Sequence, residues 1–254
     1  MPRCAGPGAS CAAQEPAPGL DPGGSCFRER GSKTADWRLH AVYDLGRGGF
    51  SHLELTDKHG AEAIDRGAPM AGEIRLGDRN FARASSLHRF RQQSADQADF
   101  IVRVGWSAFN LTRPDGTDFD LIAHLGTLPV DLAPHEVRVR ARLAPRDAAR
   151  ACAGAGFLPL RMIIRRKTPE ATEVTRKELF RDASRKQKTL DLRSLVAAEF
   201  VILATSLPAA GYPADEVLAV YRLRWQACPC EGEGRTGVQT AEITVAHGPH
   251  PHPH

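Results

Sequence analysis

The stretch "GEIRLGD" at residues 72–78 is typical of a β-strand that gives way to a loop at Asp78. In open α/β sheets, ligands bind outside the carboxyl ends of the strands. A carboxylate at that place can hold a divalent cation when other carboxylates converge on it, and Mg²⁺ prefers such oxygen ligands. An Asp at the end of a strand also often forms a turn or caps a helix. Both interpretations of Asp78 stay open at this point.

Strands and helices alternate on both sides of this stretch, which predicts an α/β fold with a mixed sheet and flanking helices. We expect strands at 37–45, 50–57, 99–106 and 199–207, and helices at 60–67, 82–93 and 213–226. The first two strands are joined by Gly46, Gly48 and Gly49, which predicts a hairpin.

Between the strands at 99–106 and 199–207, the pattern changes to short strand candidates separated by turns. These candidates are residues 118–128, 136–144 and 158–167. We therefore predict a β-rich insertion over about residues 107–195, a size within the ordinary range for a subdomain.

The two ends of the chain differ in composition from its middle. Residues 1–24 contain five prolines, five glycines and no aromatic residue, and residues 227–254 hold four of the ten histidines. Such stretches bury too little apolar surface to offset the entropy of ordering, so we expect both to be disordered around a folded domain at 25–226. No apolar run approaches the roughly 20 residues of a membrane helix. Without a recognisable secretory signal either, we expect a cytoplasmic protein with no membrane partner.

Positive charge is concentrated in one part of the chain, although the formal net charge is only +4. Residues 161–193 contain eleven Lys and Arg against five Asp and Glu. A basic stripe of this kind attracts polyanions, of which nucleic acid is the commonest, and Arg165, Arg166 and Lys167 are candidates to follow a DNA backbone. An ordinary solvated surface is the alternative interpretation.

The helix expected at 213–226 carries a second candidate set. Tyr221 and Arg224 are three residues apart, and positions 228 and 235 would return to the same helical face. An acid and a lysine at those two positions would bring one metal-binding carboxylate and several phosphate contacts to one place.

With these residues, the chain resembles the Asp-Asp-Glu transposases of bacterial insertion sequences, in the IS-four group. Their signature is Tyr, two residues, Arg, three residues, Glu, six residues, Lys, and Tyr221 and Arg224 match its first half. The segment Asp78-Arg79-Asn80-Phe81 matches the motif around their second aspartate. The resemblance covers about residues 24–226.

The resemblance implies a ribonuclease-H-like sheet interrupted by a β-rich insertion. It also implies Mg²⁺ or Mn²⁺ as cofactor, DNA (element ends and target) as partner, and a homodimer on that DNA. Asp78 would bind the metal, while Tyr221, Arg224 and Arg79 would contact phosphate, although Arg79 could instead pair with an acid. Trp106 would stack on an unpaired base, with a half-buried core tryptophan as the alternative.

The chain departs from the family pattern at both ends. Cys228 stands where the signature has Glu, and Arg235 where it has Lys. Gly23 stands in the place of the first aspartate, for which Asp21 is a nearby substitute. A thiolate prefers soft metals and cannot replace a carboxylate for Mg²⁺. We therefore expect a catalytically inactive copy, truncated or frameshifted at both ends. The alternative is a non-catalytic DNA-binding remnant that uses the basic insertion.

Overall fold

The computed structural model describes residues 37–57, 59–145, 156–226 and 241–246. The predictions for residues 1–24 and for most of the tail at 227–254, including Asp21, Gly23, Cys228 and Arg235, lie outside the described residues. The disorder predicted for this tail is wrong at residues 241–246, which form a strand paired on both sides. No helix in the described part of the chain is both long and apolar enough to span a membrane.

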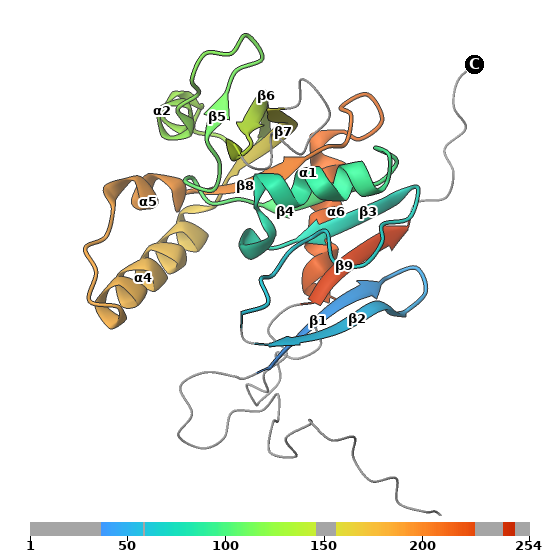
Figure 1. Ribbon diagram of the computed structural model, residues 1–254. Helices are drawn as coiled ribbons and strands as arrows, with labels where there is room; N and C mark the ends of the chain where they lie inside the picture. The colour runs from blue at the N-terminus through green and yellow to red at the C-terminus, as the bar shows by residue number, and fades with distance from the viewer. Residues whose placement is uncertain (1–36, 58, 146–155, 227–240, 247–254) are drawn as a thin grey trace, which may run out of the picture.

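The described elements form one sheet with helices around it (Figure 1). The strands are β1 (Trp37–Asp44), β2 (Gly49–Asp57), β3 (Glu73–Gly77), β4 (Asp99–Arg103), β5 (Leu111–Thr112), β6 (Pro134–Arg142), β7 (Phe157–Arg166), β8 (Phe200–Thr205) and β9 (Ala241–Ala246). The helices are η1 (Arg79–Phe81), α1 (Ala84–Gln93), α2 (Leu121–Thr127), α4 (Pro169–Arg185), α5 (Leu192–Ala197) and α6 (Ala214–Gln226). The strand order is β2-β1-β9-β3-β4-β8-β7-β6-β5.

The amino-terminal hairpin is confirmed. Strands β1 and β2 pair antiparallel from Trp37 opposite Asp57 to Asp44 opposite Gly49. The turn between them uses Gly48 with φ of +65°, a conformation that glycine adopts without steric cost. Strand β9 lies on the inner side of the hairpin, parallel to β1 and antiparallel to β3.

The direction of the central strands determines which residues meet at one edge of the sheet. Strand β3 is parallel to β4, with Gly77 opposite Val102. Strand β8 is antiparallel to β4 and β7 is antiparallel to β8, so β7 runs in the same direction as β3 and β4. The carboxyl ends of β3, β4 and β7 therefore lie at the same edge, which we call the carboxyl edge.

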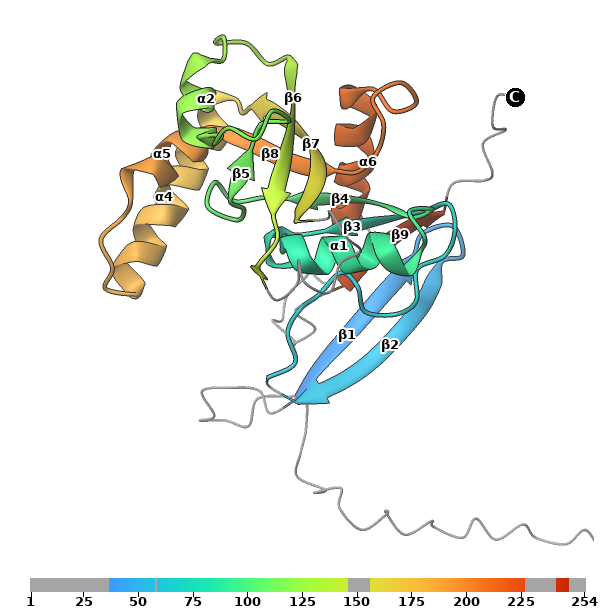
Figure 2. The same cartoon turned by 45° about the horizontal axis from the view of Figure 1, so that its top comes forward.

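Two apolar cores cover the two faces of these strands. Helix α1 contributes Leu87 and Phe90 to one face, where they pack with the cluster that includes Val102. Helix α6 contributes Val217 and Leu218 to the other face. All of these side chains are nearly inaccessible to solvent. Figure 2 shows α1 and α6 on opposite sides of the central strands.

The helix predicted at 60–67 is wrong. These residues form an irregular segment, because the buried guanidinium of Arg75 takes up the carbonyl groups that a helix would use. Arg75 Nη1 donates to the carbonyl oxygens of Ile64 and Arg66, each at 2.7 Å, and Arg75 also forms a buried ion pair with Glu73 at 2.6 Å.

The strand predicted at 118–128 is also wrong, because this segment contains helix α2. Asp120 caps the helix by accepting a hydrogen bond from the backbone N–H of Ala123 at 3.0 Å. Leu121 and Leu125, four residues apart, bury the same helical face.

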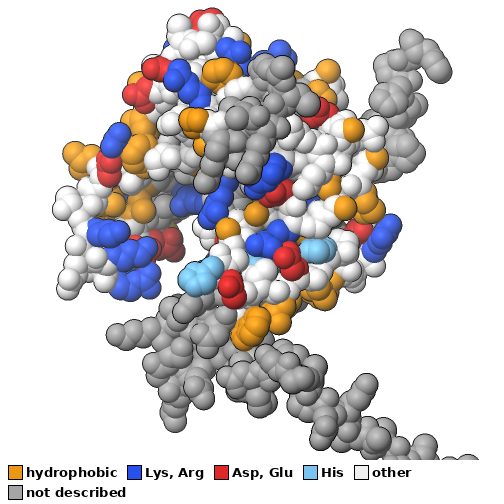
Figure 3. Space-filling model, viewed as in Figure 1, with side chains coloured by type: hydrophobic (Ala, Val, Ile, Leu, Met, Phe, Trp, Pro, Cys, Tyr) orange, Lys and Arg blue, Asp and Glu red, His pale blue; other side chains and the backbone are white. Residues whose placement is uncertain are grey.

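The remainder of the predicted insertion is mixed rather than β-rich. Its predicted strands at 136–144 and 158–167 are confirmed as β6 and β7, but these strands extend the main sheet, and α2, α4 and α5 accompany them. Helix α4 projects from the body, and Thr172 is its one buried residue (Figure 1). Hydrophobic and basic side chains mix on this projecting lobe (Figure 3), where Val174, Phe180 and Leu192 are more than half exposed.

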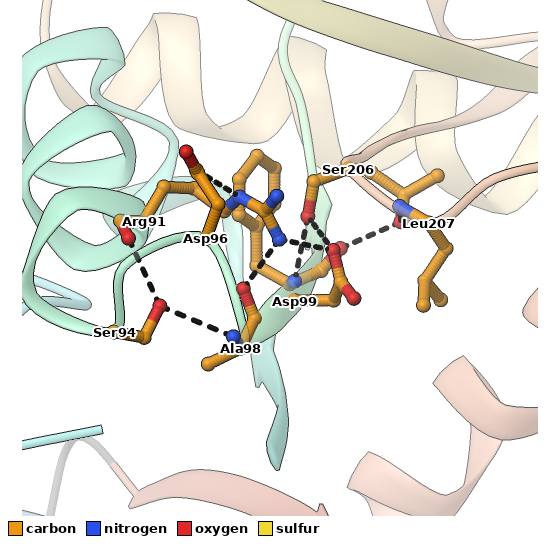
Figure 4. Close-up of polar contacts among 9 residues, drawn as sticks. Arg91, Ser94, Asp96, Ala98, Asp99, Ser206 and Leu207 are labelled. Carbon is orange, nitrogen blue, oxygen red and sulfur yellow. Dashed lines mark hydrogen bonds and ion pairs between the residues drawn. The ribbon is translucent and has the colours of Figure 1, made fainter. Parts of the chain in front are cut away.

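A polar network fastens the edge of the sheet opposite the carboxyl edge (Figure 4). Arg91 Nη1, from α1, donates to Asp99 Oδ1 at 2.5 Å and to the carbonyl oxygen of Ala98 at 2.6 Å. Ser206 Oγ donates to the same Asp99 oxygen at 2.7 Å. The carboxylate of Asp99 thus connects α1, the start of β4 and the end of β8.

We expect Asp99→Ala to lower the free energy of unfolding by about 2–3 kcal/mol, because it removes the charged acceptor that a partly buried guanidinium and a hydroxyl share. Asp182→Ala on the exposed surface of α4 is the matched control, and its effect should stay below about 0.5 kcal/mol. Denaturant unfolding measures both values. Equal effects of the two substitutions would contradict the role given to Asp99.

Candidate functional site

Asp78 lies directly after β3 at the carboxyl edge. Its Oδ1 accepts a hydrogen bond from the backbone N–H of Arg79 at 2.6 Å and so caps η1. About a third of the side chain, 38%, remains exposed to solvent. The two interpretations of this residue are therefore compatible, because Asp78 is a helix cap whose second oxygen takes no part in the cap and lies at a sheet edge.

Helix α6 brings Tyr221 and Arg224 to the same place. Arg224 Nη2 donates to Asp78 Oδ2 at 3.4 Å, although the two residues are 146 positions apart in the sequence. Tyr221 is 5% exposed and packs in the core under α6, with the Arg224 guanidinium 5.9 Å from its ring centre. Burial raises the pKa of the Tyr221 hydroxyl; Arg224 opposes this rise and Asp78 adds to it.

Arg103 also lies at this edge, although no sequence pattern predicted a role for it. Because Gly77 is opposite Val102 in the parallel pair β3–β4, Asp78 and Arg103 are next to each other at the ends of their strands. Val102 faces the α1 side, so alternation places Arg103 on the α6 side together with Tyr221. Burial raises the pKa of Tyr221, and the positive charge of Arg103 opposes part of this rise, which agrees with this placement.

Lys167 completes the group from the end of β7. Its Nζ donates to Thr175 Oγ1 on α4 at 2.8 Å. Burial, followed by the charges of Arg103 and Arg79, lowers the pKa of Lys167 from 10.5 to about 8, while Glu178 partly opposes the change. Arg79 reaches solvent, but the protein around its guanidinium and then the charge of Arg103 lower its pKa as well.

We call these side chains the carboxyl-edge cluster: Asp78, Arg79, Arg103, Lys167, Tyr221 and Arg224. Four of its six members are cationic side chains, and they come from η1, β4, α6 and the residue that follows β7. Figure 3 shows Lys and Arg side chains gathered where the α4 lobe meets the rest of the molecule. The electrostatic character of this edge is therefore positive.

The other two members of the predicted basic run do not join the cluster. Arg165 Nε donates to the carbonyl oxygen of Leu132 at 2.8 Å, and its guanidinium approaches Asp215 at 3.9 Å. Arg166 forms an ion pair with Glu199 and lies 4.5 Å from the ring centre of Phe200. Consecutive residues of a strand face opposite sides of the sheet, which separates these two guanidinium groups.

Trp106 is half-buried against the core on the α1 side. Its Nε1–H donates to Ser194 Oγ at 3.2 Å, and the guanidinium of Arg193 lies 4.3 Å from the ring centre. An unpaired base could stack on this ring only after Arg193 moved. The stacking role of Trp106 stays a prediction.

The described residues at this edge do not fit a divalent metal ion. In the described part of the chain, no group of three His, Cys, Asp or Glu side chains is close enough to hold one. Asp78 is instead beside Arg224 and Arg103, and their positive charges disfavour a divalent cation there. The same arrangement is suited to an anion.

The lowered pKa of Lys167 predicts a specific dependence of stability on pH. Between about pH 8 and pH 10.5 the unfolded chain keeps the Lys167 proton while the folded chain loses it, so this residue makes the free energy of unfolding rise with pH. Denaturant unfolding of the wild type and Lys167→Gln across this range should show the difference between them growing in favour of the wild type. A difference that stays constant would contradict the placement of Lys167.

The chain is similar in sequence to transposases of bacterial insertion sequences. It is 35% identical over 203 residues to a protein named transposase InsL for insertion sequence element IS186A, from Escherichia coli strain K12. It shares the same identity over the same length with the transposase for insertion sequence element IS421 from Escherichia coli. These matches cover 80% of this chain and 53% of each relative, so the chain spans about half the length of the curated relatives it matches.

No protein-family model and no solved structure match the chain significantly. The similarity to the transposases nevertheless covers four fifths of the chain. The chain is therefore related in sequence to the transposases of bacterial insertion sequences.

Proposed function

We propose that this chain is derived from the catalytic part of a DDE transposase of the IS-four group, and that it binds DNA at the carboxyl edge without cleaving it. The observation that carries the proposal is the ion pair between Asp78 and Arg224, which joins the two separate halves of the resemblance at one edge of the sheet. Tyr221, three residues before Arg224, lies in the same place.

The architecture supports a ribonuclease-H-like origin. A mixed sheet has helices on both faces, and the predicted metal-binding aspartate follows a central strand. Helix α6 packs on one face of that strand and its neighbour, and Arg224 in its last turn reaches the aspartate. In such a fold the ligand is expected outside the carboxyl ends of the strands.

The inactivity is proposed from the sequence and from the charge of the edge. The ancestral reaction is metal-dependent cleavage and strand transfer, with Mg²⁺ or Mn²⁺ as the ion. Cys228 and Gly23 replace two of the three carboxylates that the resemblance implies. In the described residues, the remaining carboxylate of Asp78 pairs with Arg224, and Arg103 lies beside it.

The DNA partner follows from the cationic side chains that this edge presents. Phosphate contacts from Lys and Arg give binding that does not depend on base sequence and weakens as salt rises. By resemblance, the DNA would be an element end and its target, bound by a homodimer. The alternative of a remnant that binds through the basic insertion is less well supported, because Arg165 and Arg166 already have acceptors within the protein.

Two measurements test this proposal. We expect the protein to retard duplex DNA at moderate salt, with an affinity that falls as salt rises. We also expect no nicking of supercoiled plasmid in Mg²⁺ or Mn²⁺ beyond that of Asp78→Ala, which serves as the matched background. Metal-dependent nicking that Asp78→Ala abolishes would overturn the inactivity, and an absence of retardation would overturn the DNA binding.

A further inference from the structure

We propose that Arg79, Arg103 and Lys167 form a binding site for a phosphate group beside Asp78, and that a DNA backbone phosphate is its occupant. The inference rests on the proposed function and makes it more specific, because it names which cations of this edge hold the DNA. The sequence predicted two of these residues as separate contacts and did not single out Arg103.

The register of the sheet places the three residues toward the same edge. Arg79 follows Asp78 at the end of β3, and Arg103 ends the adjacent parallel strand β4. Lys167 follows β7, and its backbone N–H donates to the carbonyl oxygen of Glu199 at the start of β8. Strand β8 lies between β4 and β7, and its residue Leu203 is opposite both Arg103 of β4 and Ile163 of β7. Lys167 therefore starts four residues further along the sheet than Arg103, and these long side chains approach closely enough that Arg103, after burial, contributes to the lowered pKa of Lys167.

Among the described residues, these three cations have no close carboxylate partner, unlike several arginines elsewhere in the protein. Elsewhere, arginines form close ion pairs with acids, as in Arg66–Glu54 at 2.7 Å, Arg75–Glu73 at 2.6 Å and Arg161–Glu136 at 2.6 Å. Within the described residues, neither Arg79 nor Arg103 has an ion pair within 4.0 Å. Lys167 donates to a hydroxyl, which leaves two of its three N–H groups for a ligand.

The net positive charge of the site also favours binding of an anion. Arg79, Arg103, Lys167 and Arg224 contribute four positive charges, against Asp78 and Glu178 with two negative ones, which leaves an excess of two. Burial first, and then the like charges of neighbouring cations, lowers the pKa values of Arg79 and Lys167. A phosphate would relieve the repulsion and accept several charge-assisted hydrogen bonds.

Phosphate could come from DNA or from a free polyphosphate, and the two sources require separate measurements. Fluorescence anisotropy with a short labelled duplex, over a series of salt concentrations, reports the DNA contacts. Thermal unfolding in inorganic tripolyphosphate reports the site without DNA. Both use the full chain and the variants Arg103→Gln and Lys167→Gln. Arg47→Gln is the matched control, because Arg47 is an exposed cation in the β1–β2 turn, at the opposite edge of the sheet.

We expect Arg103→Gln and Lys167→Gln each to weaken DNA binding about tenfold, as the loss of a charge-assisted contact does. Each should also lower the magnitude of the slope of log affinity against log salt by about 0.9, the value for one phosphate contact. Arg103→Lys keeps the charge and should keep the slope. Arg47→Gln should bind like the wild type. Tripolyphosphate should raise the melting temperature of the wild type and of Arg47→Gln more than that of the two cluster variants.

The outcomes separate this site from the proposed function. If the wild type binds DNA and the cluster variants bind it as tightly as Arg47→Gln does, the phosphate site is overturned and DNA binding stands. Tripolyphosphate stabilisation that depends on Arg103, without any DNA binding, would support a phosphate site and overturn DNA as its occupant. Neither DNA binding nor tripolyphosphate stabilisation in the wild type would overturn both.

Discussion

The parallel pairing of β3 with β4 is the constraint on which the rest of the site depends. Gly77 opposite Val102 places Asp78 and Arg103 next to each other, and β7, running in the same direction, brings Lys167 to the same edge. A slip of one residue in this register would turn a whole strand over and separate Asp78 from α6. The two cores prevent such a slip, because alternate residues of these strands are buried against α1 and α6.

With this register fixed, the charges of the side chains at the carboxyl edge determine whether it binds a cation or an anion. The Asp78 carboxylate accepts one hydrogen bond from the Arg79 backbone and another from Arg224, so its negative charge is already compensated within the protein. A divalent cation would have to displace an arginine there, whereas a phosphate oxygen would meet cations on several sides. By the resemblance to DDE transposases, the two further carboxylates of a metal site would stand at positions 23 and 228, which here are Gly23 and Cys228 and lie outside the described residues.

Short-range patterns predicted much of the fold, and long-range contacts account for what they missed. The glycine-rich turn predicted the hairpin, and alternation predicted β3, β6 and β7. The segment at 60–67 has the composition of a helix, but Arg75, eight or more residues away, takes its carbonyl groups. Helix α2 could have been found from Asp120 and the i, i+4 spacing of Leu121 and Leu125.

The site was harder to predict from sequence. Arg165 and Arg166 are consecutive and so suggest one basic patch, yet consecutive residues of a strand face opposite sides of the sheet. Arg103 can be recognised as a residue of the site only from the register of β3 and β4, which places it beside Asp78.

The most direct measurement of the central claim is amide hydrogen exchange of the full chain with and without duplex DNA. The account predicts that DNA slows exchange at η1 and at the start of α4 after Lys167, and leaves the β1–β2 hairpin unchanged. Protection confined to the hairpin, or to the exposed outer turns of α4, would contradict a DNA site at the carboxyl edge.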